Sequence, residues 1–241
     1  MSVAEHRRVV EITVEQVRGR VPVVAGAGSN DTQKAIALSR ELREVGATHM
    51  LHVAPPYSKP PQRGMLLHFR TIADAVDLPM VLYNVPSRTG CNMEAATTLE
   101  LARHPRITGT KEASGLLPQI TDIIENKPAG FTLLSGDDEI TLPVLALGGD
   151  GLISVVSNVV PHLMTELVRK GRGGDMSGAR ELHERLIPWL RAAFVESNPI
   201  PVKAALTMMG RFENVLRSPL VPLEQSHEQA VRNALRQVGA L

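Results

Sequence analysis

The chain has 241 residues, enough for one sizeable hydrophobic core, and its 43% hydrophobic and 21% charged residues are ordinary for a globular protein. The formal net charge of +1, with scattered basic residues, argues against a nucleic-acid-binding protein, in which Lys and Arg would cluster. No apolar run of about 18 residues predicts a membrane span, and the charged residues 1–20 do not resemble a signal peptide. The single cysteine, Cys91, excludes an internal disulfide and fits a reducing compartment, so we expect a cytoplasmic protein.

Strand and helix patterns alternate through the first two thirds of the chain. Residues 2–18 have the spacing of an amphipathic helix, with no cap and no strand before it, so that the chain opens in mid-helix. Short β-branched segments that end in Gly or Pro predict strands, several of them buried on both faces, at 21–28, 49–56, 79–86, 107–114, 131–138 and 151–156. Apolar spacings of three and four predict the intervening helices at 31–45, 63–75, 93–103, 118–126 and 139–147.

These repeated β–α units predict an α/β fold with a parallel sheet, either a barrel or a doubly wound open sheet. Neither GxGxxG nor GxxxxGK[ST] follows a strand, so no nucleotide-binding signature supports the open sheet. From about residue 159 only helices are predicted, at 160–171, 175–194, 200–210 and 224–238. We therefore expect a barrel-like part at 1–158, followed at 159–241 by the last barrel helix and a helical extension. Six strands do not close an eight-stranded barrel, which would need two further strands and a helix upstream.

Lys111 is the strongest candidate for chemistry. In barrels of this kind, catalytic groups lie at the carboxyl ends of the strands, and Lys111 is the one lysine inside an apolar strand. Burial favours the neutral amine, which is the form that attacks a ketone to make an imine. The alternative, on the residues alone, is a structural lysine paired with Glu112 or Asp138.

Both tyrosines of the chain, Tyr57 and Tyr83, follow predicted strands. A phenol there could carry protons during imine formation, although packing is the more common use of a tyrosine. Arg88, in the loop after the Tyr83 strand, could clamp a carboxylate, or it could be an ordinary surface arginine. The eight histidines form no HxxxH pair on a helix, so a zinc site is not expected.

Five segments resemble, in order and spacing, the signature segments of the dihydrodipicolinate synthase family. They are 82–90 (LYNVPSRTG), 109–114 (GTKEAS), 134–138 (LSGDD), 151–155 (GLISV) and 198–203 (NPIPVK), and the similarity extends over about 4–241. The resemblance implies a (β/α)8 TIM barrel that condenses pyruvate with aspartate 4-semialdehyde to 4-hydroxy-tetrahydrodipicolinate, in lysine and diaminopimelate biosynthesis. It implies no metal or organic cofactor, and a homotetramer built as a dimer of dimers.

The resemblance also implies roles for single residues. Lys111 matches the Schiff-base lysine, Tyr83 the phenol that transfers protons at the imine, and Arg88 the arginine that holds the carboxylate of the second substrate or product. Tyr57 matches a tyrosine that crosses a tight dimer interface into the neighbouring subunit's site. Two further positions, Gly136 and the backbone of Ile153, match the lining of the pyruvate pocket. The SRTG loop and the KEAS strand favour the synthase over related pyruvate-dependent 2-keto-acid aldolases, which are the alternative.

The sequence departs from the family pattern at its beginning. The first two strands and the helix between them are absent, and with them the GTTGE segment whose threonines bind the carboxylate of pyruvate. We therefore expect an N-terminally truncated barrel, either a fragment or the product of a start codon assigned too far downstream. An inactive fragment that acts only as a structural partner is the alternative from another functional class.

The regulatory site departs as well. His6 and Asn30 match residues that hold lysine in inhibited relatives, but Lys34 replaces an acid and Pro56 replaces an aromatic residue. A lysine side chain repels a lysine ligand, so we expect weak or absent inhibition by lysine. Inhibition at sub-millimolar lysine would contradict this expectation.

Overall fold

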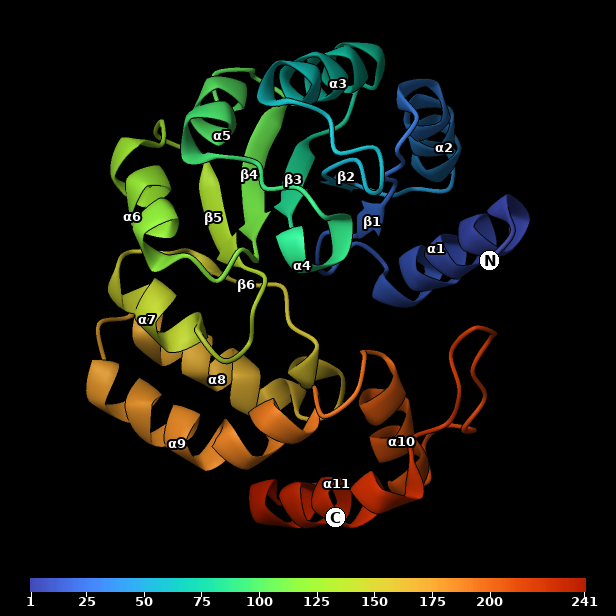
Figure 1. Ribbon diagram of the computed structural model, residues 1–241, viewed down its shortest axis with the longest axis vertical. Coiled ribbons are helices and arrows are strands. Elements are labelled where there is room, and N and C mark those ends of the chain that lie inside the picture. The colour runs from blue at the N-terminus through green and yellow to red at the C-terminus, as the bar shows by residue number, and fades with distance from the viewer. The chain divides into compact units, whose positions relative to one another are not determined.

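The computed structural model describes residues 1–241, which divide into two compact units, Met1–Gly136 and Asp137–Leu241 (Figure 1). This division differs from the boundary that we expected after residue 158, which was placed where the predicted strands end. The functional division at residue 158 stays a prediction. None of the helices combines the length and the apolar character that a membrane crossing requires.

Helix α1, Val3–Val17, begins with its own cap. The backbone N–H of Glu5 donates to Ser2 Oγ at 3.2 Å, and the N–H of Ser2 donates to Glu5 Oε2 at 2.7 Å, which together form a capping box. The expectation that the chain opens in mid-helix without a cap is therefore wrong. At the other end, Arg18 adopts a left-handed conformation and its N–H bonds to Val14 O, which closes the helix.

The first unit contains five parallel strands whose order in the sheet is their order in the chain. A doubly wound sheet reverses its strand order at a switch point, and no reversal occurs here, so that alternative is wrong. The α/β fold and the parallel sheet expected from the sequence are confirmed. The strands are β1 (Val24–Gly26), β2 (His49–Val53), β3 (Met80–Asn84), β4 (Ile107–Glu112) and β5 (Thr132–Ser135).

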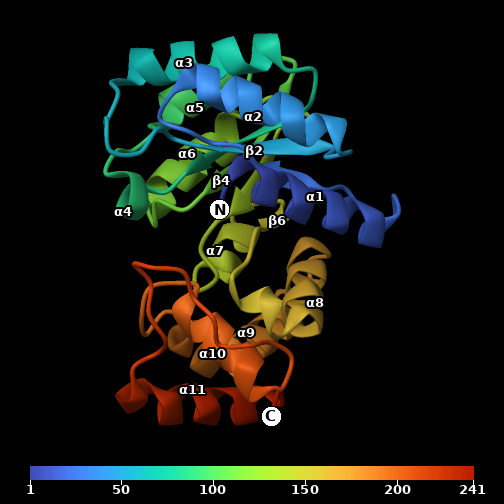
Figure 2. The same ribbon diagram turned by 90° about the vertical axis from the view of Figure 1, so that its right-hand side faces the viewer.

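Four longer helices alternate with the strands from β1 onward, and each packs next to the preceding one along the sheet (Figures 1 and 2). Each helix turns an apolar stripe toward the strands; in α3 this stripe includes Met65, Phe69 and Ile72, which are fully buried. The helices are α2 (Thr32–Glu44), α3 (Gln62–Ala75), α5 (Ala95–Leu101) and α6 (Leu117–Asn126).

A short helix that the sequence analysis did not predict, α4 (Pro86–Thr89), follows β3 directly. Proline at its first position has a backbone already set for a helix, and Gly90, with φ of 76°, ends it in the left-handed region. Because α4 is a single turn that directly follows β3, it holds Arg88 close to the carboxyl end of that strand.

The second unit is mainly helical, as the sequence predicted. The indole of Trp189 is fully buried at its centre and donates to Val156 O at 3.4 Å. Besides the two-residue strand β6 (Gly151–Leu152) and a 3-10 turn (Val156–Asn158), the unit contains α7 (Thr141–Ala146), α8 (Pro161–Arg172), α9 (Met176–Ala192), α10 (Ile200–Met208) and α11 (Gln225–Val238).

Candidate active site

Lys111 and Tyr83 lie side by side at the carboxyl ends of β4 and β3. The two residues are register partners in the parallel pair, so their side chains leave the same face of the sheet. Lys111 Nζ lies 4.2 Å from the centroid of the Tyr83 ring, and only 9% of the lysine is exposed. The structure thus brings together the two residues to which the sequence assigned imine chemistry.

Gly136 borders Lys111 at the end of β5. Its N–H donates to Glu112 O at 2.7 Å, which fixes its backbone beside β4. A Cβ at this position would lie 3.0 Å from both Cγ and Cε of Lys111 and 2.7 Å from Cβ of Ala113. The distance to Ala113 is too short for two carbon atoms and the distances to Lys111 are tighter than ordinary contacts, so the absence of a side chain here leaves space for the lysine.

Arg88 acts on the Tyr83 phenol from α4. Burial raises the pKa of Tyr83, and the positive charge of Arg88 opposes part of that rise. The phenol is therefore protonated near neutral pH and can donate a hydrogen bond or a proton. Arg88 itself is exposed, at the rim of this group of residues.

Tyr57 has its backbone tied to the same helix, but its side chain points away from the protein. Its N–H donates to Thr89 O at 3.2 Å, and its φ of 69° lies in the left-handed region, which is uncommon for a tyrosine. The residue is 91% exposed. Within a single chain, Tyr57 therefore contributes an exposed phenol next to the loop that carries Arg88.

A buried polar pair lies on the opposite face of the same two strands. Asn84 and Glu112 are register partners, each next in sequence to Tyr83 or Lys111. Asn84 Nδ2 donates to Glu112 Oε1 at 3.2 Å and to Oε2 at 3.1 Å. Both residues are fully buried, and burial raises the pKa of the Glu112 carboxyl.

The sequence analysis missed this pair, considering Glu112 only as a partner of Lys111. The available signal was the two-residue period of a strand, which turns neighbours in sequence to opposite faces. It places Glu112 behind the sheet whenever Lys111 is in front.

In the second unit, the loop that contains Ile153 is held by Asp138. The carboxylate of Asp138 is buried, and it accepts hydrogen bonds from Ser154 Oγ, from Val155 N at 2.9 Å and from Val156 N at 3.4 Å. Burial raises the pKa of Asp138, while these donors stabilise its charged form. Asp138 thus organises the backbone at Ile153, which the sequence analysis did not foresee.

The residues considered for regulation lie on separate segments. His6 is half-buried on α1, Asn30 is exposed just before α2, and Pro56 follows β2. Lys34 is exposed in the first turn of α2, where its backbone N–H donates to Asp31 Oδ1 at 2.9 Å. The substitution of an acid by Lys34 therefore puts a positive charge on the surface of this helix end.

One trio of side chains in the second unit, Glu196, Glu224 and His227, brings potential metal ligands within 4.8 Å of one another. Helix spacing could not predict it, because Glu196 comes from a distant turn. Glu196 Oε1 accepts the backbone N–H of Glu224 at 2.9 Å and Nδ1 of His227 at 2.8 Å. These contacts join the turn to the start of α11, which accounts for the trio.

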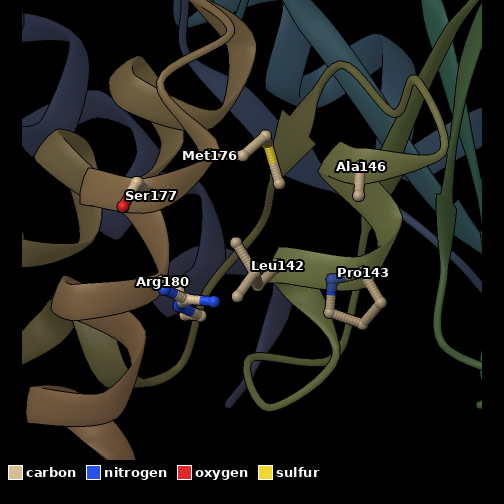
Figure 3. Close-up of a pocket in the computed structure, with 6 residues that line it drawn as sticks. All are labelled: Leu142, Pro143, Ala146, Met176, Ser177 and Arg180. Carbon is tan, nitrogen blue, oxygen red and sulfur yellow. The ribbon is translucent and has the colours of Figure 1, made fainter.

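An open pocket between α7 and α9 lies in the same unit (Figure 3). Its lining is mainly apolar, with the Arg180 guanidinium at one side, and it contains no pair of groups suited to acid–base or nucleophilic chemistry. The lining residues are Leu142, Pro143, Ala146, Met176, Ser177 and Arg180.

Comparisons with known proteins agree on one family. The model of the dihydrodipicolinate synthetase family matches residues 1–238. A 4-hydroxy-tetrahydrodipicolinate synthase from Methanopyrus kandleri is 50% identical over 242 aligned residues, which cover 100% of this chain and 81% of the relative.

Two solved structures show that the fold agrees as well. A chloride-inhibited dihydrodipicolinate synthase from Acinetobacter baumannii, in complex with pyruvate, matches with a TM-score of 0.98 and 38% identity over 100% of this chain and 83% of that chain. A monomeric dihydrodipicolinate synthase variant matches with a TM-score of 0.97 and 41% identity, over 99% of this chain and 81% of that chain. The chain therefore belongs to the dihydrodipicolinate synthetase family.

Proposed function

We propose that this chain is a Schiff-base lyase that condenses pyruvate with aspartate 4-semialdehyde to 4-hydroxy-tetrahydrodipicolinate. The observation that carries the proposal is the placement of Lys111, a nearly buried amine that lies 4.2 Å from the Tyr83 ring at the carboxyl end of a parallel strand. The family membership, with relatives of that name at about half identity, supports the same reaction.

In the first half of the reaction, the neutral amine of Lys111 attacks the ketone carbon of pyruvate and forms a carbinolamine. Loss of water then gives the imine, and loss of a proton from the methyl group gives the enamine. Tyr83 supplies a proton to the departing hydroxyl, since its phenol lies beside Lys111 and is protonated near neutral pH. Gly136 leaves the space in which the lysine reaches its substrate.

In the second half, the enamine carbon attacks the aldehyde of aspartate 4-semialdehyde. The amino group of that substrate then displaces Lys111 from the imine carbon, which closes the ring and returns the free lysine. Arg88, exposed beside Tyr83, holds the carboxylate of this second substrate. The resemblance to the family assigns the backbone of Ile153 to pyruvate binding, and within the second unit Asp138 holds the loop that contains it.

The proposal extends to architecture and assembly. The strands follow one another in chain order, which supports the proposal that they are six of the eight strands of a (β/α)8 TIM barrel, with the last barrel helix and a C-terminal helical extension at 159–241. We propose a homotetramer assembled from tight dimers in which Tyr57 completes the neighbouring site, since its exposed phenol has no role within its own chain. The single cysteine supports a cytoplasmic location.

The experiment that tests the reaction is reductive trapping with pyruvate and borohydride, followed by mass spectrometry of peptides. We expect one reduced adduct, on Lys111, and none in Lys111→Ala. Lys59→Arg is the matched control, because Lys59 lies against Gly90 near the same loop and should not affect trapping. An adduct on Lys59, or none in the unmodified chain, would refute the proposal.

The acceptor is tested separately with Arg88→Ala. Loss of the carboxylate partner should raise KM for aspartate 4-semialdehyde at least tenfold and leave KM for pyruvate nearly unchanged. An equal response to aldehydes that carry no carboxylate would favour a different 2-keto-acid aldolase.

A further inference from the structure

The buried pair behind the active site has no part in the proposed chemistry, yet it lies on the same two strand ends. We propose that Asn84 and Glu112 form a brace that fixes Tyr83 against Lys111, and that they are positioning residues for imine formation. This inference rests on the proposed function and names residues that act behind the same site.

The register of β3 and β4 gives the brace its position. Tyr83 pairs with Lys111 and Asn84 pairs with Glu112, so the polar pair crosses the two strands one residue beyond the reactive pair and on the reverse face. Any sliding or parting of the two strand ends must therefore stretch the contacts between Asn84 and Glu112, whose atoms lie 3.1 and 3.2 Å apart.

Neighbouring segments hold each member of the brace. Asn84 Oδ1 accepts the N–H of Met93 at 2.9 Å, and Asn84 Nδ2 also donates to Asn92 Oδ1 at 2.8 Å, in the segment that follows α4. The Glu112 carboxylate accepts the N–H of Ser114 at 2.7 Å and Nε2 of Gln119 from α6 at 3.4 Å. Both strand ends are therefore fixed to surrounding loops, as well as to each other.

The main chain of the pair is engaged too. Glu112 O accepts the N–H of Gly136, the residue that borders Lys111, at 2.7 Å, and Asn84 O accepts the N–H of Ala113 at 2.8 Å. A displacement of the brace therefore also moves the wall against which the lysine packs.

The free energy of burying Asn84 and Glu112 indicates that the pair positions the strand ends and does not serve mainly to stabilise the fold. A fully buried carboxylate held only by neutral donors costs desolvation free energy, and apolar residues of the same volume often stabilise a fold as well or better. What the polar pair provides is one geometry, because its hydrogen bonds are directional. Placement within about 0.5 Å is what a reactive amine and its proton donor require.

The test uses Glu112→Gln, which keeps the shape but sets amide hydrogens against the donors of Asn84 and Gln119. Active sites are counted by the final yield of borohydride-trapped pyruvate. The trapping rate per site at saturating pyruvate should fall about tenfold, equivalent to about 1.4 kcal/mol, while the pyruvate concentration for half the maximal rate changes less than about twofold. Gln119→Met, which removes a donor at the edge of the brace, should show a smaller fall of the same kind.

Thr97→Val is the matched control. Thr97 is buried on α5 and donates to Gln62 Oε1 at 2.6 Å, so its loss removes a buried hydrogen bond of the same unit that involves neither Asn84 nor Glu112. It should lower the melting temperature without changing the trapping rate per site. A Glu112→Gln protein that behaves like this control would refute the brace.

A second readout does not depend on trapping. Because the chain has only two tyrosines, Tyr57→Phe leaves Tyr83 as the one phenol that can be titrated by its ultraviolet absorbance. Burial raises the pKa of Tyr83, so adding Glu112→Gln in this background should lower that pKa toward its ordinary value, and adding Thr97→Val should not. If the unmodified chain traps no pyruvate, the proposed function fails, and this titration alone decides the brace: an unchanged pKa refutes it.

Discussion

The environment of Lys111 is set by the residues packed around it. The space for its side chain depends on the absence of a side chain at Gly136, and burial raises the pKa of the neighbouring Tyr83 more than the charge of Arg88 lowers it. Geometry of this kind comes from close packing, in which a single methyl group displaces what it touches. The reactive lysine should therefore be sensitive to small changes in its neighbours.

Gly136→Ala tests this sensitivity. The added Cβ would lie 3.0 Å from Cγ and Cε of Lys111, so the lysine must move or the strand end must shift. We expect a loss of stability of about 1–3 kcal/mol and at least a tenfold fall in pyruvate trapping per folded chain. Urea unfolding and borohydride trapping measure the two effects.

Gly26→Ala is the control for that substitution. Gly26 is the last residue of β1, whereas Gly136 directly follows β5, and a Cβ at Gly26 meets nothing within 4 Å. The unfolding free energy and the pyruvate trapping of Gly26→Ala should both stay close to those of the unmodified chain. If Gly136→Ala behaves in the same way, the lysine does not need the space that glycine leaves.

At the residue scale, the face that carries Lys111 and Tyr83 was easier to predict than the reverse face. An apolar strand around a lysine is visible in the residue order, so the buried position of Lys111 in the strand could be predicted. The partners of Glu112 could not, because Asn84 and Gln119 meet it only through the strand register and the path of two loops. Hydrogen bonds between distant segments leave no periodic pattern in the sequence.

The strands occur in the predicted order, but they are shorter than the sequence predicted. The strand expected at 21–28 is only Val24–Gly26, and the one expected at 151–156 is only Gly151–Leu152. Apolar residues continue past these strands into loops, where Val23, Ala27 and Val156 are also buried, so hydrophobicity does not mark where pairing ends. Helices were predicted more closely. Helix α11, at Gln225–Val238, was expected at 224–238, because its apolar stripe ends at Val238 and Gly239 closes the helix.

The contact between α2 and β2 supplies a prediction about acid stability. His52 on β2 is fully buried, and its Nε2 lies 3.2 Å from Ser39 Oγ, which donates its own proton to Ala35 O at 2.7 Å. His52 Nε2 is therefore the donor, and Nδ1 has no hydrogen-bond partner. Burial, with a smaller contribution from the charge of His68, lowers the pKa of His52 to about 4.

The sign of the effect follows from the two states. The unfolded chain binds a proton at His52 near its ordinary value of 6.5, whereas the folded chain does not until about 4. His52 therefore contributes its full share of the unfolding free energy above pH 6.5. This contribution, on the order of 3 kcal/mol, is lost as the pH falls from 6.5 to about 4. His52→Leu should reduce the fall in unfolding free energy between pH 7 and pH 4.5, measured with urea.

His49→Gln is the control, since His49 lies on the same strand but is only half-buried. It should retain the full pH dependence of the unmodified chain. Equal pH dependence in His52→Leu and the unmodified chain would show that folding does not lower the pKa of His52.

At the scale of the whole molecule, Tyr57 is the residue through which the proposed assembly can be tested. A tyrosine held at positive φ with 91% of its surface exposed gains nothing from its own subunit. A monomeric variant exists among the related structures, so family membership alone does not fix the number of subunits. The exposed phenol is therefore the feature of this chain from which a shared site can be tested.

Mixing two inactive variants tests this arrangement. Tyr57→Phe and Lys111→Ala should each abolish most activity, but a dimer with one subunit of each contains one site with both Lys111 and Tyr57, if the tyrosine crosses the interface. When equal amounts are refolded together, random pairing makes about half of the dimers hybrids. Each hybrid has one intact site of its two, so activity should return to about a quarter of that of the unmodified chain. If Tyr57 instead serves its own subunit, every site in every hybrid lacks one of the two residues, and no activity returns. Sedimentation of the co-refolded mixture, run alongside the assay, shows whether dimers formed, so recovery in a monomeric sample would also contradict the shared site.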